Sequence, residues 1–335
     1  MSYVLAQRNP KQLKWDVRST TLCVAAFILT MNIVATLVMV VAVLIENIDL
    51  IMAASAQSAS SAELTADLTE VMLETYGDHA GLASFIGMLC GLPWFFILRG
   101  KKFLTSDITR VNSKVKFLPL VVMLICIFAV QGFLVVIQII AEPFANMGGS
   151  GGESPFTDMM EESITSLALS PWGALYIVFL GPICEELVFR GAVMRKLEPY
   201  GANFAIVVSS LLFGLYHIIL FQAMFAFFVG LVLAYVAGRF SLKWATLLHI
   251  INNGISVFSI YMGNEVFDTL LTVCFLACLV IAPIILVVKR KYVFAQQFAG
   301  AASEPKVFAR AFTSPWLIGY IVLCVLGGVS LIAFS

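Results

Sequence analysis

Charged residues are scarce in this chain, because Asp, Glu, Lys and Arg make up only 12% of its 335 residues. A soluble globular protein carries about 25% of such residues, roughly twice this share. Hydrophobic residues account for 61% of the sequence. This composition excludes an ordinary soluble domain and indicates an all-α, polytopic membrane protein in contact with a lipid bilayer.

Other features are absent as well. The formal net charge is zero, so nothing in the composition favours a nucleic-acid partner. The seven cysteines include no C-x-x-C pair, which argues against a disulfide framework and against a zinc knuckle. Only three histidines occur, and two of them, His217 and His249, lie in the motifs described below.

Lys and Arg are missing from two long stretches between apolar segments. Residues 46–79 and 142–170 hold seven and five acidic residues and no basic one, whereas residues 99–116 hold six basic residues. Acidic and basic loops alternate in this way along the chain, and basic loops face the cytoplasm in membrane proteins. We therefore expect a cytoplasmic N-terminus and an outer position for residues 46–79, 142–170 and 263–269.

Apolar runs between these loops predict a transmembrane helix bundle with eight or nine spans, the ninth being residues 316–334. Within the first acidic loop, apolar residues recur at helical spacing from residue 64 to residue 76. This pattern predicts a short amphipathic helix on the membrane surface. The expected spans are residues 20–45, 80–98, 117–141, 172–189, 203–220, 223–237, 244–262, 270–288 and 316–334.

Two carboxylates lie side by side at the end of the apolar run that begins at Trp172. Glu185 and Glu186 would lie at membrane depth, where charges are costly and mark functional sites. Adjacent residues on a helix point about 100° apart, so the two glutamates are not expected to share one partner. Glu186 and Arg190 have the i, i+4 spacing of a helical ion pair, which leaves Glu185 for chemistry. The alternative is a purely structural ion-pair network.

Two further residue pairs, each with at least one polar member, follow on separate apolar segments. Phe213 and His217 are spaced i, i+4, and so are His249 and Asn253. Each pair shares one face of its helix, so an amide and two imidazoles could converge with Glu185 in a bundle interior. Asn252 points about 100° away from Asn253 and is not expected to belong to the motif. Taken alone, each histidine would fit an ordinary packing role.

One distance conflicts with this convergence. At about 1.5 Å of rise per residue, Glu185 and His249 lie roughly 8–10 Å from the cytoplasmic ends of their spans, but His217 lies about 20 Å from the start of its own. His217 can reach the same site only if residues 191–201 fold up into the membrane.

The three motifs, E-E-x-x-x-R, F-x-x-x-H and H-x-x-x-N, each on its own hydrophobic segment and in this order, resemble those of the CPBP family of intramembrane proteases. That family includes CAAX prenyl proteases of the Rce1 type and bacterial Abi or bacteriocin self-immunity proteins. The resemblance divides the chain into a cytoplasmic N-terminal segment (1–19), N-terminal transmembrane helices with acidic outer loops (20–170), a CPBP-like catalytic core (171–262) and C-terminal transmembrane helices (263–335).

The resemblance also implies roles for these side chains. Peptide hydrolysis needs an activated water and stabilisation of the oxyanion that forms. By resemblance, Glu185 and His217 would activate the water, while His249 and Asn253 would form the oxyanion hole. The supporting residues would be Glu186 and Arg190, which orient Glu185, and Phe213, which packs against His217 or supports its ring.

A metal site is the competing mechanism. Glu185, His217 and His249 together would be a plausible set of zinc ligands, and proteins of this family are often described as metalloproteases. However, no H-E-x-x-H motif is present and the three residues lie on separate segments. We therefore favour a metal-free glutamate mechanism without a cofactor, and keep zinc as the alternative.

These observations together predict an intramembrane endopeptidase of a bacterial plasma membrane. Its substrate would be a membrane-associated peptide or protein reached from the cytoplasmic side. Peptide maturation and bacteriocin self-immunity are both compatible roles. A non-catalytic membrane adaptor or immunity protein with the same fold is one alternative. A proton-coupled transporter is another, because paired glutamates could relay protons, but the sequence shows no inverted repeat.

Overall fold

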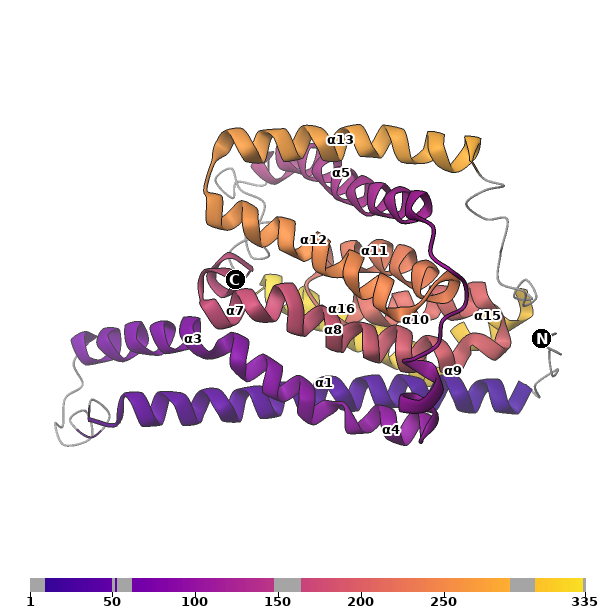
Figure 1. Cartoon of the computed structure of the whole chain (residues 1–335). Helices are drawn as coiled ribbons and strands as arrows, with labels where there is room; N and C mark the ends of the chain where they lie inside the picture. The colour runs from indigo at the N-terminus through magenta and orange to yellow at the C-terminus, as the bar shows by residue number, and fades with distance from the viewer. Residues whose placement is uncertain (1–9, 50–51, 53–61, 148–163, 290–304, 334–335) are drawn as a thin grey trace.

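The computed structural model describes residues 10–49, 52, 62–147, 164–289 and 305–333, so parts of the expected N-terminal segment and outer loops lie outside it. Within these residues the chain is helical and contains no β-strand, which confirms the all-α fold class (Figure 1). The helices outside residues 171–200 are α1 (Pro10–Glu46), α3 (Ala62–Gly91), α4 (Pro93–Arg99), a π-helical turn (Phe103–Asp107), α5 (Phe117–Met147), α10 (Ala202–Tyr216), α11 (Leu220–Arg239), α12 (Leu242–Met262), α13 (Glu265–Val288), α15 (Pro305–Phe312) and α16 (Pro315–Ala333).

Six helical stretches in the described part of the chain are long and apolar enough to cross a membrane. The bent pair of α15 and α16, with an angle of 61°, would make a seventh. The expected fourth and fifth spans are not among them, because residues 171–200 are divided into short segments and α10 has only 15 residues. The prediction of eight or nine spans is therefore not confirmed. The six stretches are Pro10–Glu46, Gly77–Arg99, Phe117–Ile140, Leu220–Arg239, Leu242–Met262 and Glu265–Val288.

The expected amphipathic surface helix is not a separate element. Residues 62–91 form one continuous helix, α3, which runs from the acidic region into the expected second span and packs along α1 (Figure 1). No proline interrupts this stretch, and α4 begins only at Pro93. Gly87 allows α3 to approach α1 closely, because a Cβ atom at Gly87 would lie only 2.4 Å from the carbonyl oxygen of Met31.

A broken helix of residues 171–200 passes through the middle of the bundle (Figure 1). It alternates between ordinary and π-helical geometry, and single π-helical turns are frequent at functional sites. The two π-helical stretches flank the segment that carries Glu185 and Glu186. The segments in order are α7 (Pro171–Leu175), the first π stretch (Tyr176–Leu180), α8 (Gly181–Glu186), the second π stretch (Leu187–Met194), α9 (Arg195–Leu197) and a 3-10 turn (Glu198–Tyr200).

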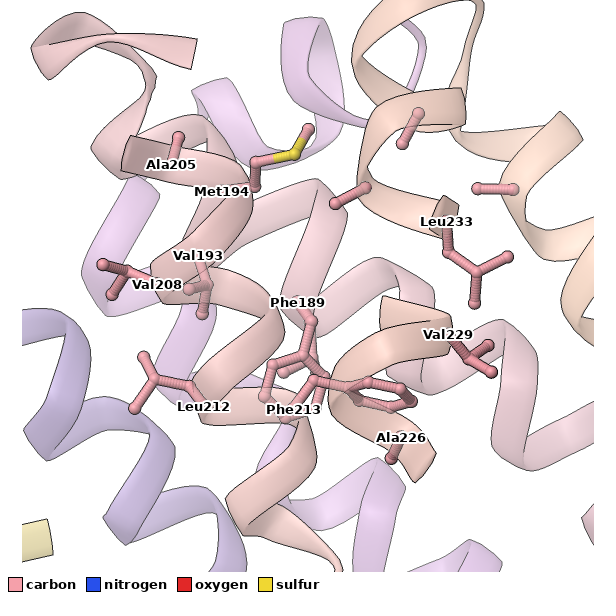
Figure 2. Close-up of a cluster of buried hydrophobic side chains, with 14 of the residues drawn as sticks. Phe189, Val193, Met194, Ala205, Val208, Leu212, Phe213, Ala226, Val229 and Leu233 are labelled. Carbon is pink, nitrogen blue, oxygen red and sulfur yellow. The ribbon is translucent and has the colours of Figure 1, made fainter. Parts of the chain in front are cut away.

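The hydrophobic core forms where the broken helix packs against α10 and α11 (Figure 2). Phe189 and Phe213 meet there edge to face, with ring centroids 5.1 Å apart. The α1–α3 pair lies on one side of this core and the α5–α13 pair on the other (Figure 1). Because lipid is as apolar as these side chains, close packing between helices holds them together. The charged motif of the broken helix is enclosed by these tightly packed side chains.

Candidate active site

Four side chains singled out by the sequence line one cavity of about 500 Å³. Glu185 lies near the end of α8, His217 follows the last turn of α10, and His249 and Asn253 lie one turn apart on α12. Residues 191–200 continue the broken helix as largely buried turns, and α10 starts directly after them. The structure therefore places His217 in the same cavity as Glu185.

The predicted ion pair between Glu186 and Arg190 forms in the protein interior. Nη1 of Arg190 lies 2.8 Å from Oε1 of Glu186, and both side chains are 0% exposed. Nη2 of Arg190 also donates to the carbonyl oxygen of Gly230 on α11, at 3.3 Å. Buried charges need such partners, because an unpaired one would cost several kcal/mol, about 3–5 in typical cases. The i, i+4 prediction for this pair is confirmed.

His249 is a partner that the two neighbouring glutamates share. Its Nδ1 atom lies 3.1 Å from Oε1 of Glu186, and its Nε2 atom lies 3.7 Å from Oε2 of Glu185. The expectation that Glu185 and Glu186 would not share a partner is therefore wrong, because an imidazole has two nitrogens that face different directions. Since an ionised carboxylate only accepts, Nδ1 donates to Glu186, and Nε2 can donate only when the ring carries both protons.

Phe213 contacts three functional side chains at once. Its ring centroid lies 5.0 Å from that of His217 and 5.8 Å from that of His249, in nearly perpendicular orientations. The guanidinium carbon of Arg190 lies 4.2 Å from the same ring. The backbone carbonyl of Phe213 lies 2.9 Å from Nδ1 of His217, and a carbonyl only accepts, so Nδ1 carries the proton. Nε2 of a neutral His217 is then left as a hydrogen-bond acceptor.

A strained turn directly follows His217. The N–H of Ile219 donates to the carbonyl of His217 at 2.6 Å, and Ile218 between them has a φ of +62°. This is a γ-turn with positive φ, which is rare and strained, especially for a β-branched residue. The carbonyl oxygen of Ile218 packs against α16, where a Cβ atom at Gly328 would lie only 2.6 Å from it. The C-terminal helix therefore supports the turn that carries His217.

Gly328→Ala is expected to displace this turn and lower the melting temperature of the purified protein, because overpacking of this kind costs about 1–3 kcal/mol. Two glycines of the same helix provide matched controls. A Cβ atom at Gly327 would meet Ile218 at an ordinary 3.5 Å, and one at Gly319 would meet nothing within 4 Å. Gly327→Ala and Gly319→Ala should melt no earlier than the wild type, since Ala favours a helix over Gly by about 1 kcal/mol. Equal melting temperatures for all three variants would show that α16 does not support the turn.

Asn253 ties α12 to the broken helix. Its Nδ2 atom donates to the carbonyl oxygen of Ile177 at 2.9 Å. That carbonyl loses its usual helical donors, because the N–H of Gly181 bonds to Tyr176 instead and Pro182 has no N–H. An amide nitrogen carries two hydrogens, so Asn253 keeps one for a ligand in the cavity.

Sequence reasoning missed two amides of this site. Asn252 was expected to face away, but it is 4% exposed, lines the cavity and donates to Oδ1 of Asn253 at 3.1 Å. The cavity extends around α12 far enough to contact side chains about 100° apart. Gln131 on α5 lines the same cavity and donates to Oδ1 of Asn252 at 3.3 Å. Its presence inside a long apolar run was the available signal.

The alternative zinc ligands do not form a metal site in this structure. Among the described residues, no group of three or more His, Cys, Asp or Glu side chains is placed to hold a metal ion. Nδ1 of His249 is engaged by Glu186, and Nδ1 of His217 is engaged by the carbonyl of Phe213. Both contacts use Nδ1, so they leave Nε2 of each ring facing the cavity, and metal-ligating histidines commonly make such contacts through their other nitrogen.

Comparison with known proteins identifies the region that holds the motifs. Residues 167–255 match the sequence model of the family described as Type II CAAX prenyl endopeptidase Rce1-like. The matched region contains all three motifs. No curated protein and no solved structure matches the chain.

Proposed function

Because residues 167–255 form an Rce1-like domain, we propose that the protein is an intramembrane endopeptidase that hydrolyses a peptide bond in a membrane-associated peptide or protein. The observation that carries this proposal is the single cavity of about 500 Å³ lined by Glu185, His217, His249 and Asn253. The cavity lies among helices that are apolar enough to cross a membrane.

In the proposed reaction, Glu185 and Nε2 of His217 hold a water molecule beside the peptide carbonyl. Glu185 takes one proton from the water while the remaining hydroxide bonds to the carbonyl carbon. The N–H groups of Asn253 and of doubly protonated His249 stabilise the oxyanion. The carbon–nitrogen bond then breaks, and Glu185 returns the proton to the leaving nitrogen.

The supporting residues act mainly on the two imidazoles in this proposal. Glu186 orients His249, which it contacts at 3.1 Å, and Arg190 balances the charge of Glu186 at 2.8 Å. Phe213 fixes the tautomer of His217 through its carbonyl oxygen. Glu186 therefore orients Glu185 indirectly, through the ring of His249 that lies between them.

The orientation and location complete the proposal. The alternating loop charges favour a cytoplasmic N-terminus, and the resemblance to bacterial members favours a bacterial plasma membrane. Peptide maturation and bacteriocin self-immunity are the roles that such a protease fits. In a cysteine-free background, a Cys placed at exposed Ser106 should resist an impermeant thiol reagent added outside intact cells; labelling there would reverse the orientation.

Comparing the membrane peptidomes of cells that produce the wild type or Glu185→Gln tests the function. The proposal predicts a set of cleavage products that only the wild type releases. The same products from both cell populations would favour a non-catalytic adaptor. The peptide that spans a wild-type cleavage site then serves as a substrate for purified protein.

Metal dependence is tested on the same purified protein. If Glu185 and His217 activate the water without a metal, cleavage should continue at an unchanged rate after dialysis against a strong chelator. Metal analysis should find less than one zinc per chain. Stoichiometric zinc in the wild type that is lost, together with activity, in His249→Ala would contradict the metal-free mechanism.

A further inference from the structure

A row of three side-chain amides leads from α5 into the proposed active site. Nε2 of Gln131 donates to Oδ1 of Asn252 at 3.3 Å, and Nδ2 of Asn252 donates to Oδ1 of Asn253 at 3.1 Å. Nδ2 of Asn253 donates in turn to the carbonyl oxygen of Ile177 at 2.9 Å. All four residues line the cavity. We call Gln131, Asn252 and Asn253 the amide row.

The direction of the amide row is fixed at its inner end. The carbonyl oxygen of Ile177 can only accept, so Asn253 must present its NH₂ group to it and its oxygen to Asn252. Asn252 must then present its own NH₂ group to Asn253 and its oxygen to Gln131. Turning over any one amide would place oxygen against oxygen or NH₂ against NH₂. Each amide therefore selects the orientation of the next.

We infer that Gln131 and Asn252 are positioning residues, which keep the NH₂ group of Asn253 on the side where an oxyanion would form. This inference rests on the proposed function, and it extends the site beyond the Rce1-like region of residues 167–255, because Gln131 lies on α5. Without Asn252, the oxygen of Asn253 would lose its partner. Asn253 would then be held only by its hydrogen bond to Ile177, so its second N–H could move away from the position of the oxyanion.

A purely structural role would also give these amides partners, because buried amides are nearly always hydrogen-bonded. The two roles differ in what they do to turnover. A structural role lowers stability and leaves kcat unchanged. A positioning role lowers kcat with little change in KM, and the effect disappears once Asn253 itself is removed.

The test measures kcat, KM and melting temperature on purified protein, with a quenched fluorescent peptide that copies the cleavage site found in the peptidome comparison. Gln131→Met should lower kcat about fivefold, the rate equivalent of one typical hydrogen bond. Asn252→Leu should lower kcat at least about tenfold, and Asn253→Ala about 10²–10³-fold. Asn47→Leu is the matched control, because Asn47 is a half-buried amide outside the cavity whose Nδ2 atom donates to Oγ1 of Thr75 at 3.1 Å; its kcat should equal that of the wild type.

The decisive comparison uses double variants. In an Asn253→Ala background, neither Gln131→Met nor Asn252→Leu should lower kcat further. Melting temperatures should show the same coupling between Gln131→Met and Asn252→Leu, whether or not the protein cleaves the peptide.

The outcomes distinguish a failure of the positioning role from a failure of the proposed function. If Gln131→Met and Asn252→Leu lower the melting temperature additively, the residues of the amide row do not act together and the inference is overturned. Coupled melting temperatures with an unchanged kcat in an active enzyme would overturn its positioning role but leave the proposed function intact. If the variants show coupled melting temperatures but the wild type cleaves no peptide, the proposed function is overturned, and the positioning role with it.

Discussion

Glu185→Gln protein is expected to fold and to bind its substrate peptide, but to cleave none of it at a measurable rate. Glutamine keeps the size of the side chain, which is 8% exposed in the cavity, but it cannot accept the proton of the attacking water. General-base catalysis contributes about 10²–10⁴-fold to such reactions. The loss should exceed this range if Glu185 also returns the proton to the leaving nitrogen.

The measurements are the cleavage rate, the affinity for labelled peptide and the melting temperature. Glu265→Gln is the matched control, because Glu265 is an exposed residue at the start of α13, outside the cavity. Its cleavage rate should equal that of the wild type. A Glu185→Gln protein that cleaves as fast as this control would remove Glu185 from the mechanism.

Breaking the Glu186–Arg190 pair is expected to lower the free energy of unfolding more than any other substitution proposed for this protein. Both side chains are 0% exposed and their closest atoms lie 2.8 Å apart, so either single substitution leaves the other charge buried without its counterion. Breaking a buried pair typically lowers the free energy of unfolding by about 3–5 kcal/mol. Glu186→Gln and Arg190→Ala should each lose this much, and the double variant should lose less than the sum.

Unfolding of each variant in detergent, followed by denaturant or heat, measures these losses. Glu46→Gln is the control, because Glu46 contacts His79 on the surface with 44% of its side chain exposed. An exposed pair contributes about 0–1 kcal/mol, so this variant should unfold nearly like the wild type. Strictly additive losses in the Glu186 and Arg190 double variant would mean that the two residues do not stabilise each other.

Local spacing predicted the features that depend on one helix. The i, i+4 rule identified the Glu186–Arg190 pair and placed His249 and Asn253 on one face of α12, because both depend only on helical periodicity. Hydropathy predicted the all-α class, because long apolar runs predict membrane-spanning helices. The convergence of three motifs on one cavity followed from their shared polarity in apolar segments.

Features that depend on contacts between helices were missed. His249 contacts both glutamates because α12 crosses beside the end of α8, and no spacing within either helix encodes that crossing. The expected fourth and fifth spans are not confirmed, because π-helical stretches divide residues 171–200 and α10 has only 15 residues. Gln131 joins the site only because α5 packs beside α12, far from it in sequence.

Hydrolysis in water enriched with oxygen-18 tests the central claim most directly. Purified protein in lipid nanodiscs is incubated with the peptide identified from the membrane, and the products are weighed by mass spectrometry. If the cavity activates water, each new carboxyl terminus from a wild-type reaction carries one oxygen atom from the solvent, and Glu185→Gln yields no such product. Intact peptide in the wild-type reaction, or equal labelled product from Glu185→Gln, would contradict this account.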